Sequence, residues 1–346
     1  MTELQDIIFM QRGLRLARQG LGRVAPNPAV GCVIVRDGQV LGEARTQNGG
    51  RPHAETVAIS MAVAEQSSSF DDLHRATAYV TLEPCAHHGQ TGPCARALID
   101  SGVSRVVVAM RDPDPRVSGR GVDMMRAAGI DVEVGICEAA AQDLNAGFIL
   151  KTTQGRPLVT LKLAISRNGM MRRAAGEDPA ITSGPAQRRM HLIRAEHDAI
   201  LVGAGTYRHD KPSLTCRLPG MLADSPMPHI ASSTLQKTGL PDGWRILTQD
   251  SPAEMLAALA ANGVTRLMVE GGPTLAKAFL SEGLVDRLAV FEAPIDLPLL
   301  PAGTDNAPKQ SDLQYMGIEN FANSPSFKFI SSEKCGTDSL RIFQRG

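Results

Sequence analysis

Short apolar runs with strand character alternate with helical patterns along most of the chain, and this alternation constrains the fold more than any other sequence feature. Residues 5–20 have the spacing of an amphipathic helix, residues 30–35 read as a strand, and Asp37-Gly38 is a typical hairpin turn. Strands separated by helices are typical of sheets with helices packed on their faces. The pattern therefore predicts an α/β fold.

The first half continues in the same way. The expected elements are a strand near Val40, a helix over 53–65, a strand over 78–82, a helix over 94–100, a strand over 105–110, a helix over 121–128, a strand over 131–134 and a linking helix over 138–149. This order predicts an α/β/α sandwich.

The second half alternates too, and predicts a mostly parallel sheet with helices on its faces. The expected elements are a strand over 158–165, a helix over 185–196, a strand over 199–202, a Pro-rich irregular tract to about residue 243, a helix over 252–262, a strand over 266–269, a helix over 273–281 and a closing strand over 287–291.

The length indicates two domains, because a single hydrophobic core stops growing well before 346 residues. We expect a first domain over residues 1–150 and a second over 151–346, with the boundary near 152–156.

Charge and composition exclude several classes of protein. Lys and Arg total 36, as do Asp and Glu, so there is no basic excess to attract a nucleic acid. No stretch reaches the 18 apolar residues of a membrane span, and the N-terminus lacks the apolar core of a signal peptide. We expect a cytoplasmic protein whose six scattered cysteines are free thiols or metal ligands.

One histidine and two cysteines in the first half have the order of a metal site. His53 opens the helix of His53-Ala54-Glu55, Cys85 follows a strand, and Cys94 begins another helix. Three such ligands leave a fourth tetrahedral position for water, which is typical of catalytic zinc, whereas a structural zinc needs a fourth protein ligand. The pattern therefore predicts a catalytic Zn²⁺ held by His53, Cys85 and Cys94.

Glu55 is the expected catalytic acid and base. It lies two residues beyond His53, so on a helix it points away from that ligand and is free to move protons. A carboxylate beside an activated water can take its proton and pass it to a departing amine, as hydrolytic deamination requires.

These residues resemble the cytidine-deaminase-like superfamily. Eight residues separate the two cysteines in Cys85-Ala86-His87-His88-Gly89-Gln90-Thr91-Gly92-Pro93-Cys94, and this wide spacing is similar to that of the riboflavin-biosynthesis deaminases. The segments 26–35 and 112–121 match that family too. The resemblance implies deamination of a phosphorylated diaminopyrimidinone, with Asn27 at the pyrimidine and residues 87–89 lining the pocket.

Two positions depart from the family pattern in this half. Thr46 stands where a pocket histidine is common, and Gln90 where a Lys or Arg is usual. Loss of a cation there could weaken contacts to the phosphate or pyrimidine without affecting the zinc chemistry.

Two glycine-containing segments mark the second half. Val202-Gly203-Ala204-Gly205 ends a strand, and on residue type alone a plain tight turn explains it best. In Val269-Glu270-Gly271-Gly272-Pro273 a strand runs through two glycines into a helix with Pro in its first turn, so the free N–H groups suit a cofactor phosphate. A glycine turn before an ordinary helix is the alternative.

The second half resembles the dihydrofolate-reductase-like reductase domain that is fused to this deaminase in bacterial enzymes. The resemblance implies reduction of a ribosyl chain to ribityl by NADPH. It places NADPH at Ala164, Thr206, Asp210, Gly272, Pro273, Thr274 and Leu275. It places the phosphorylated substrate at Asp178, Arg194, Leu214, Arg217 and Glu270, where two arginines could bind one phosphate.

Three departures concern the reductase half. Asn168 replaces an Asp, Asp178 a substrate-binding Ser, and Ala180 a Trp. The alternatives are therefore a bifunctional enzyme, or an active deaminase whose second domain serves only in binding or oligomerisation. A nucleic-acid or nucleoside deaminase is a third, which the neutral charge disfavours. We expect a homo-oligomer acting on a small phosphorylated pyrimidine.

Overall fold

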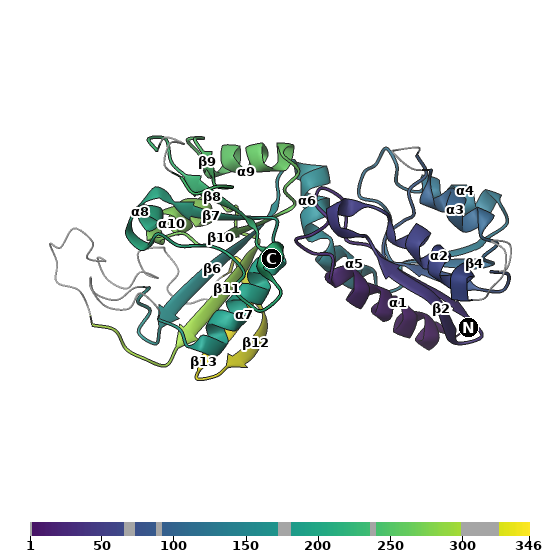
Figure 1. The fold of residues 1–346 in the computed structure, drawn as a ribbon, viewed down its shortest axis with the longest axis horizontal. Coiled ribbons are helices and arrows are strands. Elements are labelled where there is room, and N and C mark those ends of the chain that lie inside the picture. The colour runs from purple at the N-terminus through teal and green to yellow at the C-terminus, as the bar shows by residue number, and fades with distance from the viewer. Residues whose placement is uncertain (1, 66–72, 88–91, 172–180, 236–239, 299–324) are drawn as a thin grey trace. The chain divides into compact units, whose positions relative to one another are not determined.

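The strands of the chain form two separate sheets. The structure, a computed structural model, describes residues 2–65, 73–87, 92–171, 181–235, 240–298 and 325–346 (Figure 1). It divides into two compact units, Met1–Gly155 and Arg156–Gly346, and each unit contains one of the sheets.

The first unit contains a five-stranded sheet in the order β2-β1-β3-β4-β5, with β1 antiparallel to both neighbours and β3, β4 and β5 parallel. Its elements are α1 (Glu3–Arg18), β1 (Gly31–Arg36), β2 (Gln39–Arg45), α2 (Ala54–Glu65), β3 (Thr77–Val80), α3 (Cys94–Asp100), β4 (Arg105–Val108), α4 (Arg120–Ala127), β5 (Asp131–Val134), α5 (Glu138–Leu144) and α6 (Ala146–Gln154).

Helices cover this sheet in two groups: α1 packs with α5, while α2, α3 and α4 pack in succession (Figure 1). The central strands are largely apolar and buried because both of their faces contact helices. The core of β4 consists of Val106, Val107 and Val108. The α/β/α sandwich expected from the sequence is confirmed.

The single helix expected over 138–149 is wrong, because the structure contains two helices that break at Asn145. The Asn145 side chain is buried and bonds to the backbone of Ala29 in both directions, accepting from its N–H and donating to its carbonyl. An amide side chain that pairs with another segment in this way competes with the regular helix.

The second unit contains an eight-stranded sheet in the order β12-β13-β11-β6-β10-β7-β8-β9. Its elements are β6 (Leu158–Ser166), α7 (Gly184–Ala195), β7 (Ala199–Gly203), α8 (Ala204–Asp210), β8 (Met227–Ala231), β9 (Arg245–Leu247), α9 (Pro252–Ala261), β10 (Arg266–Val269), α10 (Pro273–Ser281), β11 (Arg287–Ala293), β12 (Phe327–Cys335) and β13 (Asp338–Arg345).

Strands β11, β6, β10, β7, β8 and β9 run parallel, while β13 is antiparallel to both of its neighbours, β11 and β12. The mostly parallel sheet is thus confirmed. The prediction of an irregular tract up to residue 243 is wrong, because this part of the chain contains α8 and β8. Strand β9 and the hairpin are further additions to the expected elements. Among the described residues no helix is long and apolar enough to cross a membrane.

Candidate functional sites

Three ligand atoms from three elements meet in the first unit. His53 precedes α2, Cys85 follows β3, and Cys94 begins α3. The Nδ1 atom of His53 lies 3.2 Å from Sγ of Cys94 and 3.8 Å from Sγ of Cys85. All three ligand atoms lie within 4.8 Å of one another, and they form the one cluster of metal-ligating groups found among the described residues.

The cluster fits a tetrahedral zinc ion. Zinc binds nitrogen and thiolate at about 2.0–2.3 Å, so tetrahedral ligands stand roughly 3.6 Å apart. The separations of 3.2 and 3.8 Å bracket that value. Nitrogen and sulfur donors are the set that zinc prefers over magnesium or calcium.

Cys85 is prepared to act as a thiolate ligand. A hydrogen bond from the Cys94 thiol, together with hydrogen bonds from His53 and from the Cys94 backbone, lowers the pKa of Cys85 to about 4 despite its burial. The backbone N–H of Cys94, at the start of α3, lies 3.3 Å from the Cys85 sulfur. The helix start therefore stabilises negative charge on Cys85.

Glu55 lies in the first turn of α2 beside these ligands. Its side chain is buried, and its Oε2 atom has no hydrogen-bond partner. Burial raises the pKa of Glu55 to about 7. A buried carboxyl with one unpartnered oxygen can both accept and release a proton near neutral pH.

Glu83 fixes the segment that carries Cys85. Its buried carboxylate accepts hydrogen bonds from four backbone N–H groups, those of Asp112, Gly119, Gly121 and Val122. Two of these donors belong to the first turn of α4, whose N-cap residue is a glycine without a capping side chain. Glu83 thus caps α4 from another part of the chain, and it ties residues 112–122 to the metal-ligand turn.

The remaining residues expected in the deaminase pocket have mixed surroundings. Asn27 donates from Nδ2 to the carbonyl of Gly50 at 2.8 Å, and any side chain at residue 50 would collide with the Asn27 amide. Thr46 is buried and accepts a hydrogen bond from the backbone of Val30. His87 is exposed, and Gln90 lies outside the described residues.

In the second unit, the carboxyl ends of β7 and β10 bring two of the expected cofactor residues together. The hydroxyl of Thr206, in α8, accepts a hydrogen bond of 3.1 Å from the backbone N–H of Gly272. Gly272 is the N-cap of α10, and Pro273 follows in the first turn. Open α/β sheets bind ligands at this edge. Thr274 and Leu275 continue α10, and Ala164 lies in β6, which neighbours β10.

Arg194 and Glu270 form a buried, two-point ion pair. The Nε and Nη2 atoms of Arg194 bind the two carboxylate oxygens of Glu270 at 2.6 and 3.0 Å, and Nη1 donates to the Thr215 carbonyl. Lys162 lies 3.8 Å from Glu270. Despite burial, the charges of Arg194 and Lys162 lower the pKa of Glu270, so its carboxylate stays ionised.

The loop after α8 carries the other expected substrate residues. Leu214 is buried with φ of 54°, and Lys211 has φ of 40°. Positive φ at residues other than glycine costs roughly 1–3 kcal/mol each, and such strain gathers at ligand sites. Arg217 is exposed and contacts the Ser213 hydroxyl, while Asp210 is exposed at the end of α8.

Asn168 is held in place by hydrogen bonds. Its amide donates to the Leu297 carbonyl at 2.7 Å, and its side-chain oxygen accepts from the Leu297 N–H and from the Ser166 hydroxyl. A carboxylate could not make the first of these bonds. Asp178 and Ala180, the other two departures, lie outside the described residues.

Sequence reasoning missed Glu83 and Lys162. Lys162 interrupts the apolar strand β6, and a charged side chain within such a strand was the available signal. Glu83 had no comparable signal, because its four donors lie about 30 to 40 positions further along the chain.

Matches to two family models agree with the division of the chain into two units. Residues 4–110 match the cytidine and deoxycytidylate deaminase zinc-binding region, and residues 157–339 match the RibD C-terminal domain. With the His/Cys/Cys cluster and the two α/β sheets, these matches define a zinc-binding deaminase domain followed by a reductase domain.

Full-length relatives carry both domains. The riboflavin biosynthesis protein RibD of Escherichia coli (strain K12) is 37% identical over an alignment that covers 97% of this chain and 98% of that protein. RibD of Aquifex aeolicus (strain VF5) is also 37% identical, with 98% of each chain covered. The chain belongs to the RibD family of bifunctional riboflavin biosynthesis enzymes. Zinc and NADPH are the cofactors of its deaminase and reductase domains.

Solved structures of relatives share the whole architecture. RibD of Acinetobacter baumannii (form 1) has a TM-score of 0.84 and 34% identity, and each chain is covered completely. A Thermotoga maritima protein described as a diaminohydroxyphosphoribosylaminopyrimidine deaminase and 5-amino-6-(5-phosphoribosylamino)uracil reductase has a TM-score of 0.86 and 31% identity over the same full coverage. The expected cytidine-deaminase-like and dihydrofolate-reductase-like fold is confirmed.

Proposed function

We propose that the first domain hydrolyses the 2-amino group of 2,5-diamino-6-ribosylamino-4(3H)-pyrimidinone 5′-phosphate, and that the second then reduces the ribosyl chain to ribityl with NADPH. The main support is the buried Glu55 carboxyl, whose Oε2 atom has no hydrogen-bond partner, beside the cluster of His53, Cys85 and Cys94. The name of the Thermotoga maritima relative supports the choice of substrate.

In the deaminase domain, His53, Cys85 and Cys94 would hold the zinc ion, which would supply an acidified water molecule as the nucleophile when bound. Glu55 accepts the proton of the attacking water at Oε2 and donates it to the departing amine. Asn27, whose Nδ2 donates a hydrogen bond to the carbonyl of Gly50, contacts the pyrimidine ring.

In the reductase domain, the residues that would hold NADPH are Ala164, Thr206, Asp210 and the start of α10 from Gly272 to Leu275. The free N–H groups of α10 suit a cofactor phosphate. Hydride transfer needs mainly orientation from the protein, because the nicotinamide carries the chemistry.

Arg217 is the main contact of the substrate phosphate, and Leu214 and Asp178 are further substrate contacts. Arg194 directs three N–H groups to Glu270 and Thr215, so it acts mainly by orienting the Glu270 carboxylate toward the ribosyl chain. Arg217 is exposed, and its hydrogen bond to Ser213 is long, at 3.4 Å, which leaves the guanidinium available to an anion.

The alternative is an active deaminase whose reductase domain serves only in binding or oligomerisation. The substitutions at 178 and 180 favour it. The hydrogen bond from Asn168 to Leu297 and the hydrogen bond between Gly272 and Thr206 favour an active reductase. We further propose a cytoplasmic homo-oligomer, which cell fractionation and light scattering of the purified protein would test.

A coupled assay tests the proposal. Purified, zinc-replete protein receives the diaminopyrimidinone ribosylamino phosphate, while ammonia release and NADPH oxidation are followed in one cuvette. We expect both, with oxidation dependent on prior deamination. Ammonia without NADPH oxidation would establish the alternative, and the absence of both would refute the substrate assignment.

A further inference from the structure

A buried histidine lies next to the residues proposed to bind the reductase substrate. His191 is in α7, three positions before Arg194, so the two side chains leave the helix on the same face. His191 is only 5% exposed, and its Nδ1 atom is buried without a hydrogen-bond partner. Buried polar atoms are rarely left unpaired, and each exception needs a physical reason.

The charged groups of the proposed substrate site act on the ring of His191. Burial lowers the pKa of His191, and the positive charges of Arg194 and Arg217 lower it further, while the charge of Glu270 opposes them. The imidazole is therefore neutral at pH 7. A neutral ring adds no third positive charge to repel the two arginines, and it keeps one N–H group as a hydrogen-bond donor.

His191 also contacts the loop that carries Arg217. A hydrogen bond between the ring and the Thr215 backbone raises the pKa of His191, as it does when the ring donates and a carbonyl accepts. Because Nδ1 has no partner, the donor is Nε2. The Thr215 carbonyl also accepts from Nη1 of Arg194 at 3.0 Å, and its two lone pairs allow two donors. Two side chains of α7 thus fix one peptide group of the loop.

The backbone of this loop needs such support. Leu214 is buried with φ of 54°, and a conformation of this kind persists only where the surroundings hold it. The Cys216 thiol provides a second link to α7, because it donates to the His191 carbonyl at 3.4 Å. Arg217 is the next residue and is exposed. The place of its guanidinium therefore depends on how firmly residues 214–216 are held against α7.

We propose that His191 is a positioning residue of the reductase site, which donates from Nε2 to the Thr215 carbonyl and thereby holds the Arg217 guanidinium in place for the substrate phosphate. His191 itself does not contact the substrate. The inference rests on the proposed reductase function and deepens it, since it names a residue that sets the affinity for the phosphate.

Two amide variants separate this role from simple filling of space. In His191→Gln the NH₂ group stands about where Nε2 stands and can donate to Thr215, whereas in His191→Asn it stands near the place of Nδ1 and falls short. We expect His191→Asn to weaken binding of the deaminated substrate, 5-amino-6-(5-phosphoribosylamino)uracil, by about fivefold, as the loss of one hydrogen bond implies. His191→Gln should restore most of this affinity.

A double-mutant cycle tests whether His191 acts through Arg217. Arg217→Ala removes the phosphate contact itself, so adding His191→Asn to it should cause no further loss of affinity. Losses that add fully would mean that His191 acts on another part of the site. Circular dichroism and denaturant unfolding of each variant check that the second domain remains folded.

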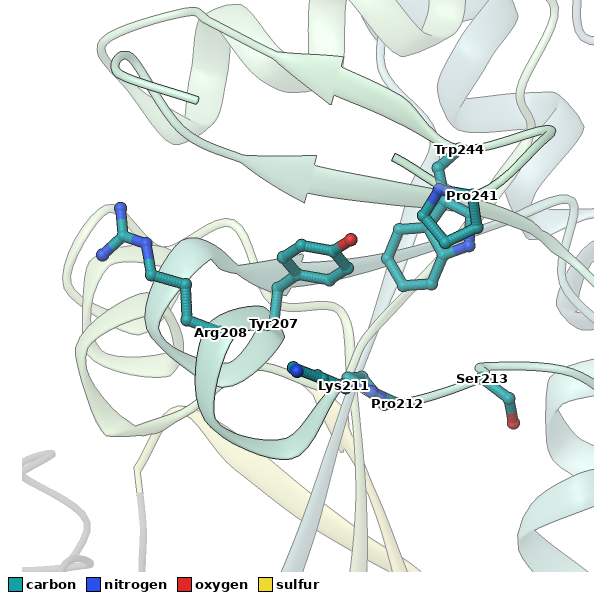
Figure 2. A pocket seen from close by; sticks show the side chains of 7 residues that line it. All are labelled: Tyr207, Arg208, Lys211, Pro212, Ser213, Pro241 and Trp244. Atoms are coloured by element: carbon teal, nitrogen blue, oxygen red, sulfur yellow. The ribbon is translucent and has the colours of Figure 1, made fainter. Parts of the chain in front are cut away.

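Binding is measured on the full-length protein without NADPH, so that no turnover is needed. Calorimetry gives the affinity, and the emission of Trp244, the only Trp of the chain, reports on the second domain. Trp244 lines a pocket together with Ser213, which directly precedes Leu214 in the loop (Figure 2).

The outcomes separate this inference from the proposed function. A loss in His191→Asn that is restored in His191→Gln and absent beside Arg217→Ala supports the positioning role, even if no NADPH is oxidised with substrate. Equal losses in the two amide variants, or additive losses in the cycle, overturn it and leave the reductase standing. An unaltered protein that oxidises no NADPH, and whose Trp244 emission does not respond to the ligand, overturns both.

Discussion

At the scale of single residues, Glu55 combines two properties that rarely coincide. Its carboxyl is almost fully buried, and one of its oxygens has no partner. A buried polar atom normally finds a hydrogen bond, because leaving it unpaired costs about 1–3 kcal/mol. The fold thus maintains an unfavourable arrangement beside the metal ligands, as is common where a protein prepares a reacting group.

The first prediction concerns this carboxyl. Glu55→Gln should lower the rate of ammonia release by about 10²–10⁴-fold, because an amide keeps the shape of the side chain but cannot transfer the proton. Metal analysis should find the zinc content unchanged. Glu43→Gln, on the partly exposed surface of β2, is the control and should keep full activity. A fully active Glu55→Gln enzyme would end the proton-transfer role.

At the scale of elements, the second prediction concerns the cap that Glu83 provides to α4. Glu83→Gln turns an NH₂ group toward two backbone donors, so the first domain should lose roughly 2–4 kcal/mol of unfolding free energy. Denaturant unfolding would measure the loss. Glu43→Gln breaks an ion pair with Arg12 at the surface and should cost less than about 1 kcal/mol. Equal losses in the two variants would contradict the capping role.

The third prediction concerns the hydrogen bonds that connect Asp6 of α1 to β3 and β4. Burial opposes ionisation of Asp6, but hydrogen bonds from Arg105 and Tyr79 outweigh it and lower the pKa of Asp6 below 3.8. A lowered pKa in the folded state stabilises the fold above the ordinary pKa, and this contribution is lost as the pH falls through the folded value.

Asp6→Asn should therefore destabilise the first domain at neutral pH, and the difference from the unaltered protein should shrink below about pH 3.8. Unfolding free energies measured across this range provide the test. A difference that stays constant with pH would show that the Asp6 charge contributes nothing.

The sequence predicted those elements whose pattern is local. The strands and helices of the first domain follow the periodicity of their own residues, and the His53, Cys85 and Cys94 cluster follows from spacing. The break at Asn145 depends on Ala29, more than a hundred positions away, and the cap at Glu83 depends on a distant loop. Partners of this kind leave no periodic signal. Strand β12 is exposed along most of its length, so it lacks an apolar pattern.

At the scale of the whole molecule, each domain carries its own core and its own site. The three metal ligands lie in the first unit, while Thr206, Gly272 and Glu270 lie in the second. The largest core cluster contains residues of the first unit alone. The two activities should therefore respond separately to a change that affects one site.

The fourth prediction follows from this separation. Removing zinc with a chelator should abolish ammonia release but leave NADPH oxidation intact when the enzyme receives the already deaminated substrate. Added zinc should restore the first activity. Loss of both activities on chelation would mean that the second domain depends on the metal of the first.

The place of β13 in the sheet has a consequence for how the protein is made. β13 is the last of the described strands along the chain, yet it pairs between β12 and β11. β6, β7, β10 and β11 are therefore synthesised before β12 and β13. Until the hairpin of β12 and β13 forms, β11 has an unpaired, largely apolar edge. An open edge of this kind invites pairing with other chains. The nascent second domain is thus most prone to aggregation just before β13 is synthesised.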